Sequence, residues 1–416
     1  MTLSQELTWR GFVNQTTYKD VTAVDGDPIT FYWGVDPSAD SMTIGNLAAA
    51  MMVHHFMSYG HKAILLVGGA TGLIGDPDGK TQERDLKSLE TIASNKAGIV
   101  AQYQRIFDGL DFEVVDNYDW FSGLNYIDFL RDVGKHVPIS QMLGREFVQS
   151  RLGENGSGIS YAEFSYSLIQ GYDYLHLHRE RAATLQVCGA DQWGNSIAGV
   201  DLIRRVTGDE AHVWSTPLVI NKSTGVKFGK SESGAIWLDA SKTSPTQLYQ
   251  FCINLDDEGV ADYLKIFTLL SPEDISEVMQ SHEVNRQARS AQTRLAAAVT
   301  QLVHGNEALS FAETVTAYLT GRRSLVEATD DQLVEVRRNL PSVTVDVGSS
   351  IITALVDAGL CQSASDARRM LAANAISIND QKSSRDIFTA DDFQNGRLLL
   401  RRGKAYKDSA LIERAQ

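Results

Sequence analysis

The amino-acid sequence predicts an α/β protein with a parallel sheet, followed by a helical region and a small α+β module. The first observation is a strand, helix, strand unit. Apolar runs at residues 29–33 and 63–67 flank residues 46–59, whose apolar side chains recur near helical spacing. Because a crossover helix brings the chain back to the same end of the sheet, the two strands run parallel. A further buried strand is expected at residues 184–187.

The second observation is a change of character after residue 245. Residues 245–325 are rich in helix formers and show apolar residues at helical spacing, which predicts a helical region. Residues 326–348 contain Pro341 and Gly348 and are expected to connect this region to the tail. The tail is predicted to form helix, helix, strand and strand at residues 351–359, 363–373, 376–378 and 397–401.

Length and charge narrow the class of protein. A chain of 416 residues that is 43% hydrophobic can bury more than one core. The formal net charge is −14, while residues 349–416 carry ten Lys or Arg and eight Asp or Glu, so the rest of the chain carries −16. This balance argues against indiscriminate binding of nucleic acid, and against DNA as a partner. We expect any RNA contact to use local basic patches in the tail.

Apolar runs and cysteines indicate the compartment. No apolar run approaches the roughly 18 residues that cross a membrane, and residues 1–10 lack a basic-then-apolar signal pattern. The cysteines, Cys188, Cys252 and Cys361, are widely spaced. That spacing fits a reducing compartment and offers neither a disulfide framework nor a zinc pattern. We therefore expect a cytoplasmic protein with no membrane contact and no metal site.

Glycines with acidic or amide residues follow each predicted strand. Residues 34–37 lead into the start of a helix at residues 43–46, residues 68–76 follow the second strand, and residues 188–195 follow the third. Ligands of open α/β sheets bind at the carboxyl ends of strands, and a helix start offers free N–H groups to phosphate. Each segment alone could be an ordinary turn; their convergence predicts a pocket.

A second phosphate signal lies far along the chain, in Lys227-Phe228-Gly229-Lys230-Ser231. Its glycine lets the backbone fold over a polyphosphate, and its lysines can neutralise the charge. By itself such a turn is most often a solvated loop. Combined with the helix start at residues 43–46, it predicts a nucleoside triphosphate site.

One predicted helix carries a polar face. Asp173 follows Gln170 by three residues and Tyr166 by seven, which places all three on one side of a helix. These side chains can line one pocket; the alternative is a merely solvated face.

Five segments in order, residues 32–47, 67–84, 163–173, 186–195 and 227–231, carry a family resemblance. The chain resembles the bacterial tyrosyl-tRNA synthetases, which are class I aminoacyl-tRNA synthetases, over nearly its whole length. The resemblance implies a Rossmann-type catalytic domain at residues 1–240, with a dimerisation insertion around residues 120–165. It also implies an all-α anticodon-binding domain, a linker and a ribosomal-protein-like RNA-binding domain, at residues 241–330, 331–348 and 349–416.

The resemblance implies activation of L-tyrosine by ATP, with Mg²⁺, to tyrosyl adenylate and pyrophosphate. Tyrosine then passes to the 3′-terminal adenosine of tRNA(Tyr). A homodimer without a tightly bound cofactor is expected.

The resemblance also assigns residue roles. The expected catalytic residues are Thr43, Asn46, Lys80, Arg84, Lys227 and Lys230. ATP is expected at Gly34, Ser38, Gly45, Gly189 and Asp191, together with Lys227 and Lys230. The tyrosine phenol is expected at Tyr32 and Asp173, and the rest of the amino acid at Asp36, Asp76, Tyr166, Gln170 and Gln192. The tRNA is expected at Arg204 and Arg205 and, in the basic tail, at Arg368, Arg369, Arg401 and Arg402.

The chain departs from the family pattern where Thr43 replaces a histidine, Trp33 a small residue and Cys188 a glycine. Two alternatives stay open. A tryptophan-specific relative is disfavoured by Asp173 and Tyr32, because an indole has no hydroxyl. A non-catalytic RNA-binding paralogue is compatible with Thr43 and Cys188, although the two lysines of residues 227–231 weigh against it.

Overall fold

The computed structural model describes residues 1–77, 86–153, 156–228, 230–231, 234–403 and 408–415. The chain forms two compact units. The first comprises Met1–Thr243 and Ile253–Val303, and the second Ser244–Cys252 and His304–Gln416. The sequence-based division into domains follows different boundaries and stays a prediction.

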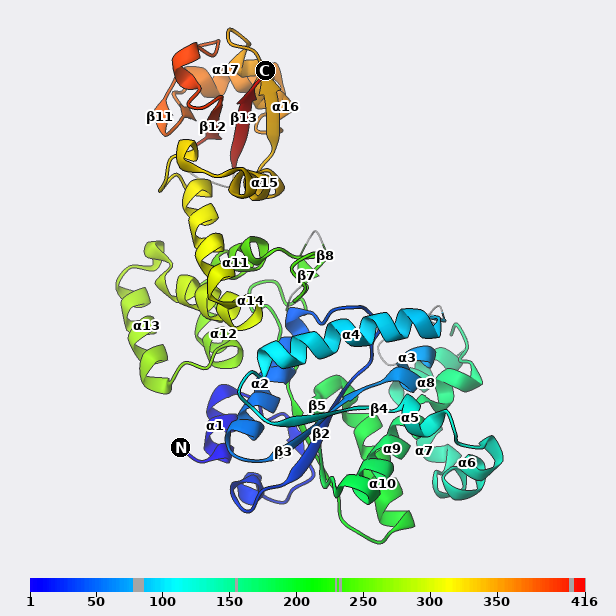
Figure 1. Ribbon diagram of the computed structural model, residues 1–416. Helices are drawn as coiled ribbons and strands as arrows, with labels where there is room; N and C mark the ends of the chain where they lie inside the picture. The colour runs from blue at the N-terminus through cyan, green and yellow to red at the C-terminus, as the bar shows by residue number, and fades with distance from the viewer. Residues whose placement is uncertain (78–85, 154–155, 229, 232–233, 404–407, 416) are drawn as a thin grey trace. The chain divides into compact units, whose positions relative to one another are not determined.

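The first unit is built on a six-stranded sheet (Figure 1). The spatial order of its strands is β1 (Gln15–Thr16), β6 (His212–Thr216), β5 (Leu185–Gly189), β2 (Thr30–Val35), β3 (Lys62–Val67) and β4 (Phe112–Asp116). All neighbours pair in parallel except β1, which is antiparallel to β6. The predicted α/β class and parallel sheet are confirmed.

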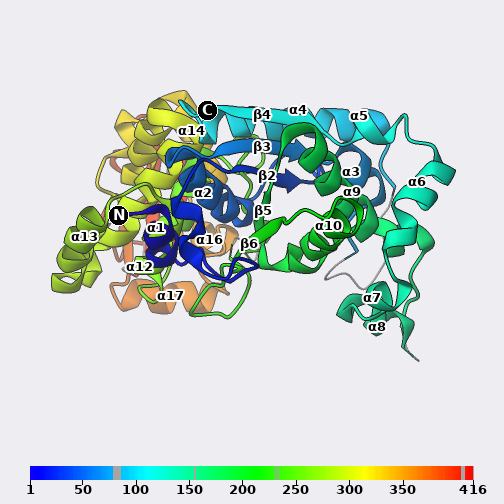
Figure 2. The ribbon, with the colours of Figure 1, turned by 90° about the horizontal axis from the view of Figure 1, so that it is seen from below.

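Helices cover both faces of this sheet, as Figures 1 and 2 show. They are α2 (Ile44–Ser58) and α4 (Leu89–Ile106) on one face, and α9 (Tyr161–Arg181) and α10 (Trp193–Val206) on the other. Successive side chains of β2 alternate between the faces. Phe31 and Trp33 pack against Phe56 of α2 and Tyr103 of α4, whereas Tyr32 joins a core cluster with residues of α9 and α10. This alternation directs Tyr32 toward the polar face of α9.

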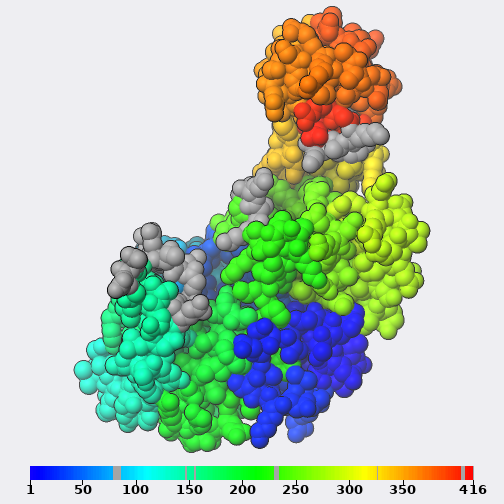
Figure 3. All heavy atoms as spheres, turned by 180° about the vertical axis from the view of Figure 1, so that it is seen from behind, coloured from blue at the N-terminus to red at the C-terminus, as the bar shows by residue number. Residues whose placement is uncertain are grey.

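Shorter elements complete the first unit. They are α1 (Leu3–Arg10), α3 (Gly69–Ile74), α5 (Tyr118–Phe121), α6 (Tyr126–Asp132), α7 (Ile139–Leu143), α8 (Glu146–Leu152), β7 (Lys230–Ser231), β8 (Gly234–Ala235), α12 (Val260–Phe267) and α13 (Pro272–Val284). The Arg10 guanidinium donates to the carbonyls of Lys265, Thr268 and Leu270 at 2.7–2.8 Å. It thereby satisfies carbonyls at the end of α12. In Figure 3 the N-terminal atoms (blue) lie against those of this helical segment (yellow-green).

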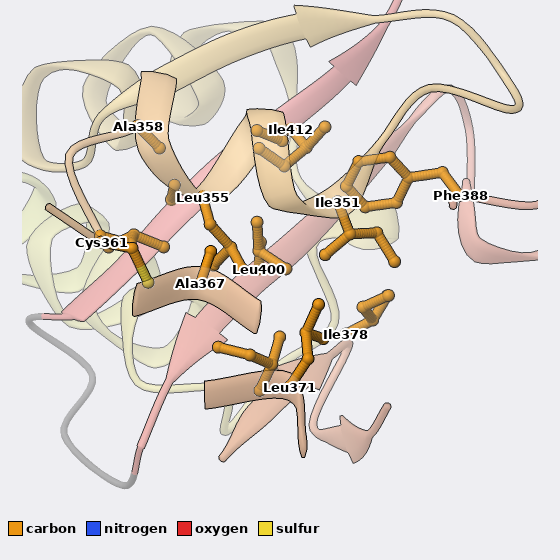
Figure 4. Close-up of a cluster of buried hydrophobic side chains, with 14 of the residues drawn as sticks. Ile351, Leu355, Ala358, Cys361, Ala367, Leu371, Ile378, Phe388, Leu400 and Ile412 are labelled. Atoms are coloured by element: carbon orange, nitrogen blue, oxygen red, sulfur yellow. The ribbon is translucent and has the colours of Figure 1, made fainter. Parts of the chain in front are cut away.

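The second unit contains most of α11 (Pro245–Ile253) and a five-stranded sheet. The sheet order is β11 (Gln381–Lys382), β10 (Ile376–Ile378), β12 (Arg397–Arg402), β13 (Ser409–Arg414) and β9 (Ser342–Val345). Its remaining helices are α15 (Asp330–Asn339), α16 (Ile351–Asp357) and α17 (Ala364–Ala372). Leu355, Leu371 and Leu400 belong to the core that packs these last two helices on the sheet (Figure 4). Helix α14 (Ser290–Leu319) begins in the first unit, ends in the second and is kinked at Gly305.

The predicted helices and strands of the tail correspond to α16, α17, β10 and β12. Strands β9, β11 and β13 were not predicted. Residues 331–348, predicted as a linker, contain most of α15 and all of β9, and β9 pairs in parallel with β13. No helix within the described residues is long and apolar enough to cross a membrane.

Candidate active site

A cavity of about 430 Å³ lies in the first unit, at the carboxyl ends of parallel strands. Segments that follow β2, β3, β5 and β6 line it, together with one face of α9 and the start of α2. Every predicted catalytic, tyrosine-binding and ATP-binding residue whose side chain is described lines this cavity. Lys80 and Arg84 lie outside the described residues, as does the side chain of Lys230.

One end of the cavity contains the buried carboxylate of Asp173, which is 2% exposed. It accepts hydrogen bonds from Asn117 Nδ2 at 3.1 Å and from Trp120 Nε1 at 3.0 Å. Burial raises the pKa of Asp173 well above its ordinary value, and the two hydrogen bonds oppose that rise. Sequence reasoning missed both donors. Asn117 follows β4 as the other amide segments follow their strands, but only the pairing of β4 with β3 in the folded sheet brings it to Asp173.

The hydroxyl of Tyr32 lies in the same region of the protein as Asp173. Tyr32 lines the cavity, is 1% exposed, and its Oη has no hydrogen-bond partner within the described structure. Burial and then the charge of Asp173 raise the pKa of Tyr32 well above its ordinary value, so the hydroxyl keeps its proton. A buried hydroxyl without a partner is costly to the fold. A ligand hydroxyl that met both Tyr32 and Asp173 would remove that cost.

A hydrogen-bond network joins Asp173 to Asp36. Asn117 also donates to Thr71 Oγ1 at 3.0 Å. The Thr71 hydroxyl donates to Asp36 Oδ1, and Tyr166 Oη donates to Asp36 Oδ2, both at 2.6 Å. Residue 68 must be glycine here, because a Cβ would lie 2.2 Å from Asp36 Oδ1 and 2.1 Å from Thr71 Oγ1. The glycine-rich segment after β3 therefore orients a carboxylate of the cavity.

A second network holds Gln192. Its amide Nε2 donates to Asp76 Oδ2 at 2.5 Å, and its Oε1 accepts from Asn195 Nδ2 at 3.1 Å. Arg145 Nη1 in turn donates to Asn195 Oδ1 at 2.7 Å. These contacts fix which way the Gln192 amide faces, and they extend from the cavity to the start of α8.

The two phosphate signals of the sequence meet at the other end of the cavity. Thr43 is the N-cap of α2, and its backbone N–H and its hydroxyl donate to Asn46 Oδ1 at 2.9 and 3.0 Å. Thr43 also forms an antiparallel bridge with Trp237. A Cβ on Gly45 would lie 3.8 Å from the carbonyl oxygen of Phe228. The helix start at residues 43–46 and Lys227-Phe228 therefore border one space, where a cation and a helix N-terminus are suited to an anion.

Asp191 and Lys227 line the same end. Burial raises the pKa of Asp191, and the charge of Lys227 opposes the rise. Lys227 itself is exposed. This end of the cavity thus combines a solvent-facing cation, a carboxylate and the start of α2, where the N–H groups of Ile44 and Asn46 already donate to the carbonyls of Ile236 and Thr43. Within the described residues no group of three or more His, Cys, Asp or Glu is placed to hold a metal ion.

The predicted tRNA-contacting arginines lie outside the cavity. Arg204 pairs with Asp201 at 2.8 Å, and Arg205 donates to the carbonyl of His136. In the second unit, Arg368 and Arg369 lie on α17, and Arg402 is the last residue of β12. Arg369 pairs with Asp366 at 2.7 Å. Arg401 pairs with Asp380 at 2.7 Å and is only 12% exposed, so it presents little of its guanidinium to solvent.

Comparison with known proteins gives the family. Residues 25–319 match the model of class I tRNA synthetases for tryptophan and tyrosine, and residues 332–407 match that of the SYY-like C-terminal domain of tyrosine–tRNA ligases. Tyrosine–tRNA ligase of Geobacillus kaustophilus is 43% identical over 97% of this chain and 98% of its own. That of Pectobacterium carotovorum is 41% identical over 97% of both chains. The chain belongs to the tyrosine–tRNA ligase family. The predicted family and its class I aminoacyl-tRNA ligase chemistry are confirmed.

Solved structures support the fold. A C-terminally truncated mitochondrial tyrosyl-tRNA synthetase of Aspergillus nidulans has a TM-score of 0.69 and 28% identity, over 76% of this chain and 94% of its own. A Plasmodium falciparum tryptophanyl-tRNA synthetase also matches, with a TM-score of 0.53 and 14% identity, over 80% of this chain and 88% of its own. The latter likeness shows the shared fold alone, whereas the relatives that match nearly the whole chain are tyrosine–tRNA ligases.

Proposed function

We propose that this tyrosine–tRNA ligase family member activates L-tyrosine with ATP and transfers it to tRNA(Tyr), and that Asp173 and Tyr32 select the amino acid. The observation that carries this proposal is the buried carboxylate beside a buried, unpartnered hydroxyl. A phenol can donate to Asp173 while it accepts from Tyr32. Phenylalanine would leave both groups unpaired, and an indole N–H would leave the Tyr32 hydroxyl without an acceptor.

The rest of the tyrosine is proposed to lie along the two networks. Asp36, Asp76, Tyr166 and Gln170 present oxygens that suit the ammonium group. Gln192 would lie near the carboxylate of the bound tyrosine. Because Asp36 and Gln192 are already oriented by other side chains, tyrosine binding would need little rearrangement.

The first reaction is attack of the tyrosine carboxylate on the α-phosphorus of ATP. A C–O–P bond forms, the α–β phosphoanhydride bond breaks, and pyrophosphate leaves. An amino-acid carboxylate, with a pKa of about 3.5, is already ionised at neutral pH, so no general base is needed. Catalysis therefore depends on positioning and charge. Lys227, with Lys230, Lys80 and Arg84 and the Mg²⁺ that accompanies ATP, would neutralise the leaving pyrophosphate.

The nucleotide is proposed to lie across the helix start of α2. Thr43, Asn46, Gly45 and Ser38, including the backbone N–H of Gly45, would contact phosphate or ribose, next to the backbone of Gly34. Asp191 and Gly189 would hold the ribose hydroxyls. A neutral Thr43 can donate a hydrogen bond but carries no positive charge, so it would stabilise developing negative charge less than a protonated histidine.

In the second reaction the 3′-terminal adenosine hydroxyl of the tRNA attacks the adenylate carbonyl and AMP leaves. Arg204 and Arg205 would meet the acceptor end, and Arg368, Arg369 and Arg402 would contact the tRNA elsewhere. Arg401, predicted with them, pairs with Asp380 and has little exposed guanidinium for such a contact. We also propose cytoplasmic location and the domain roles implied by the family. A homodimer through residues 120–165 is supported by the exposed apolar side chains of that stretch, which include Tyr126, Ile127, Ile139 and Tyr161.

The test is exchange of labelled pyrophosphate into ATP with tyrosine, phenylalanine and tryptophan in parallel. We expect exchange with tyrosine alone, followed by tyrosine transfer to tRNA(Tyr). Exchange with tryptophan would favour a tryptophan-specific enzyme. No exchange by folded protein would instead support a non-catalytic RNA-binding role.

A further inference from the structure

The indole of Trp120 has contacts on two sides. Its Nε1 donates to Asp173 Oδ1 at 3.0 Å. Its ring stacks on the imidazole of His176, with ring centroids 4.4 Å apart and an interplanar angle of 21°. His176 follows Asp173 by three residues on α9, so both lie on the same side of the helix. One turn of α9 therefore contacts both the N–H and the face of this indole.

The position of the Trp120 side chain depends on the His176 imidazole, because Trp120 lies on a short helix and borders open space. Trp120 lies on α5, a helix of four residues, which is too short to fix a side chain by its own backbone. Trp120 and His176 both line a second cavity of about 350 Å³, with Asp119 and Arg181 among its other residues. The indole thus borders open space on one side, although it also packs partly against the core. His176 stacks on a face of this partly buried ring.

We propose that His176 is a positioning residue for tyrosine recognition, which holds the Trp120 indole so that its N–H stays on Asp173. This inference rests on the proposed function, because it concerns the carboxylate that would accept the tyrosine hydroxyl. Without the imidazole, the indole can rotate toward the second cavity. Asp173 would then lose one of its two donors, and its carboxylate would be less well oriented for the phenol.

Three variants distinguish the loss of ring stacking from the loss of a titratable group and from a change in the stability of α9. His176→Ala removes the ring, whereas His176→Phe keeps a flat ring that can stack. Burial lowers the pKa of His176, so the imidazole is neutral at neutral pH and phenylalanine is a fair mimic. The matched control is His178→Ala. His178 lies on the same helix, but its ring contacts the carbonyl of Ala183 and the carboxylate of Asp209.

Pyrophosphate exchange in the full chain gives KM for tyrosine, KM for ATP and kcat. In His176→Ala we expect KM for tyrosine to rise about 2- to 10-fold, the range of one aromatic contact. KM for ATP should stay within about twofold, and His176→Phe should restore most of the tyrosine affinity. His178→Ala should lower the melting temperature without changing KM for tyrosine. The inference would be overturned if KM for tyrosine did not change in His176→Ala, or if it rose equally in His176→Phe.

A double-mutant cycle tests the route of action. Trp120→Phe keeps a ring but removes the N–H that reaches Asp173. If His176 acts through that N–H, adding His176→Ala to Trp120→Phe should raise KM for tyrosine no further. Additive increases would overturn the route through Trp120. Absence of tyrosine-dependent exchange in the unmodified chain is a different result, because it would overturn the proposed function and this inference with it.

Discussion

The two ends of the cavity are built in different ways. At the Asp173 end the polar side chains are buried and held by other side chains, as in the links from Asp173 through Asn117 and Thr71 to Asp36. At the Lys227 end the described groups include an exposed ammonium, the Asp191 carboxylate, a helix start and close-approaching backbone. Recognition of one hydroxyl needs a dry, oriented donor and acceptor. Recognition of a polyphosphate can depend on charge and backbone N–H groups.

This contrast predicts that substitutions at the two ends of the cavity will change different kinetic constants. A change at the buried end should act on tyrosine alone, because its groups are dedicated to one hydroxyl. A change at the exposed end should act on ATP and should depend on salt, because exposed charge is screened.

The largest effect is expected for Asp173→Asn. The asparagine keeps the shape but loses the charge, and its amide cannot accept from both Asn117 and Trp120 while it also accepts from a phenol. We expect kcat/KM for tyrosine to fall by at least about 100-fold in pyrophosphate exchange, with KM for ATP within about twofold. Asp209→Asn, on the exposed partner of His178, is the control. Near-normal tyrosine affinity in Asp173→Asn would contradict the assigned pocket.

Stability gives an independent reading of the same substitution. Because burial raises the pKa of Asp173, the folded protein keeps this proton to higher pH than the unfolded chain does. Stability contributed by Asp173 is therefore complete below the unfolded pKa and is lost as pH rises through the folded pKa. Asparagine does not titrate. The melting temperature of Asp173→Asn relative to the unmodified protein should thus be higher at pH 8 than at pH 4.

A smaller effect is expected at the exposed end, for Lys227→Gln. Loss of one charge-assisted contact to phosphate should raise KM for ATP, or lower kcat, by about 10- to 100-fold. Tyrosine affinity measured by calorimetry should not change, and the difference from the unmodified protein should shrink as salt increases. Lys222→Gln is the matched control, because Lys222 lies in the same segment but pairs with Asp262. Weaker tyrosine binding in Lys227→Gln would show that the two ends are not independent.

Sequence patterns predicted the parts of the cavity that are local. Tyr166, Gln170 and Asp173 lie on one face of α9 as their spacing requires, and the segments after β2, β3 and β5 all reach the cavity. Asn117 and Trp120 could not be placed from local pattern, because their contact with Asp173 depends on β4 lying beside β3 in the folded sheet. The unpartnered hydroxyl of Tyr32 is likewise a property of the packed core, which no spacing reveals.

The tail shows a different kind of miss. Residues 326–348 were predicted as a connecting segment because of Pro341 and Gly348, yet Thr329 and Gln332 form the capping box of α15. The alternation of Ser342, Val343, Thr344 and Val345 is also the period of a strand, which is β9. Those signals were present in the sequence. The sequence alone does not show which strand pairs with β9, because β13 lies about 70 residues further along the chain.

The smallest effect should be the most informative, because it has opposite signs on activity and stability. Tyr32→Phe removes a buried hydroxyl that has no partner within the described structure, so the melting temperature should stay level or rise. KM for tyrosine should rise about 2- to 10-fold, the value of one neutral hydrogen bond. Tyr174→Phe is the contrasting variant: its hydroxyl donates to the carbonyl of His212 at 2.7 Å, and its ring lies 5.1 Å from that of Tyr32. It should lower the melting temperature and leave KM for tyrosine unchanged. If Tyr32→Phe also lost stability at constant KM, the Tyr32 hydroxyl would serve the fold and not the ligand.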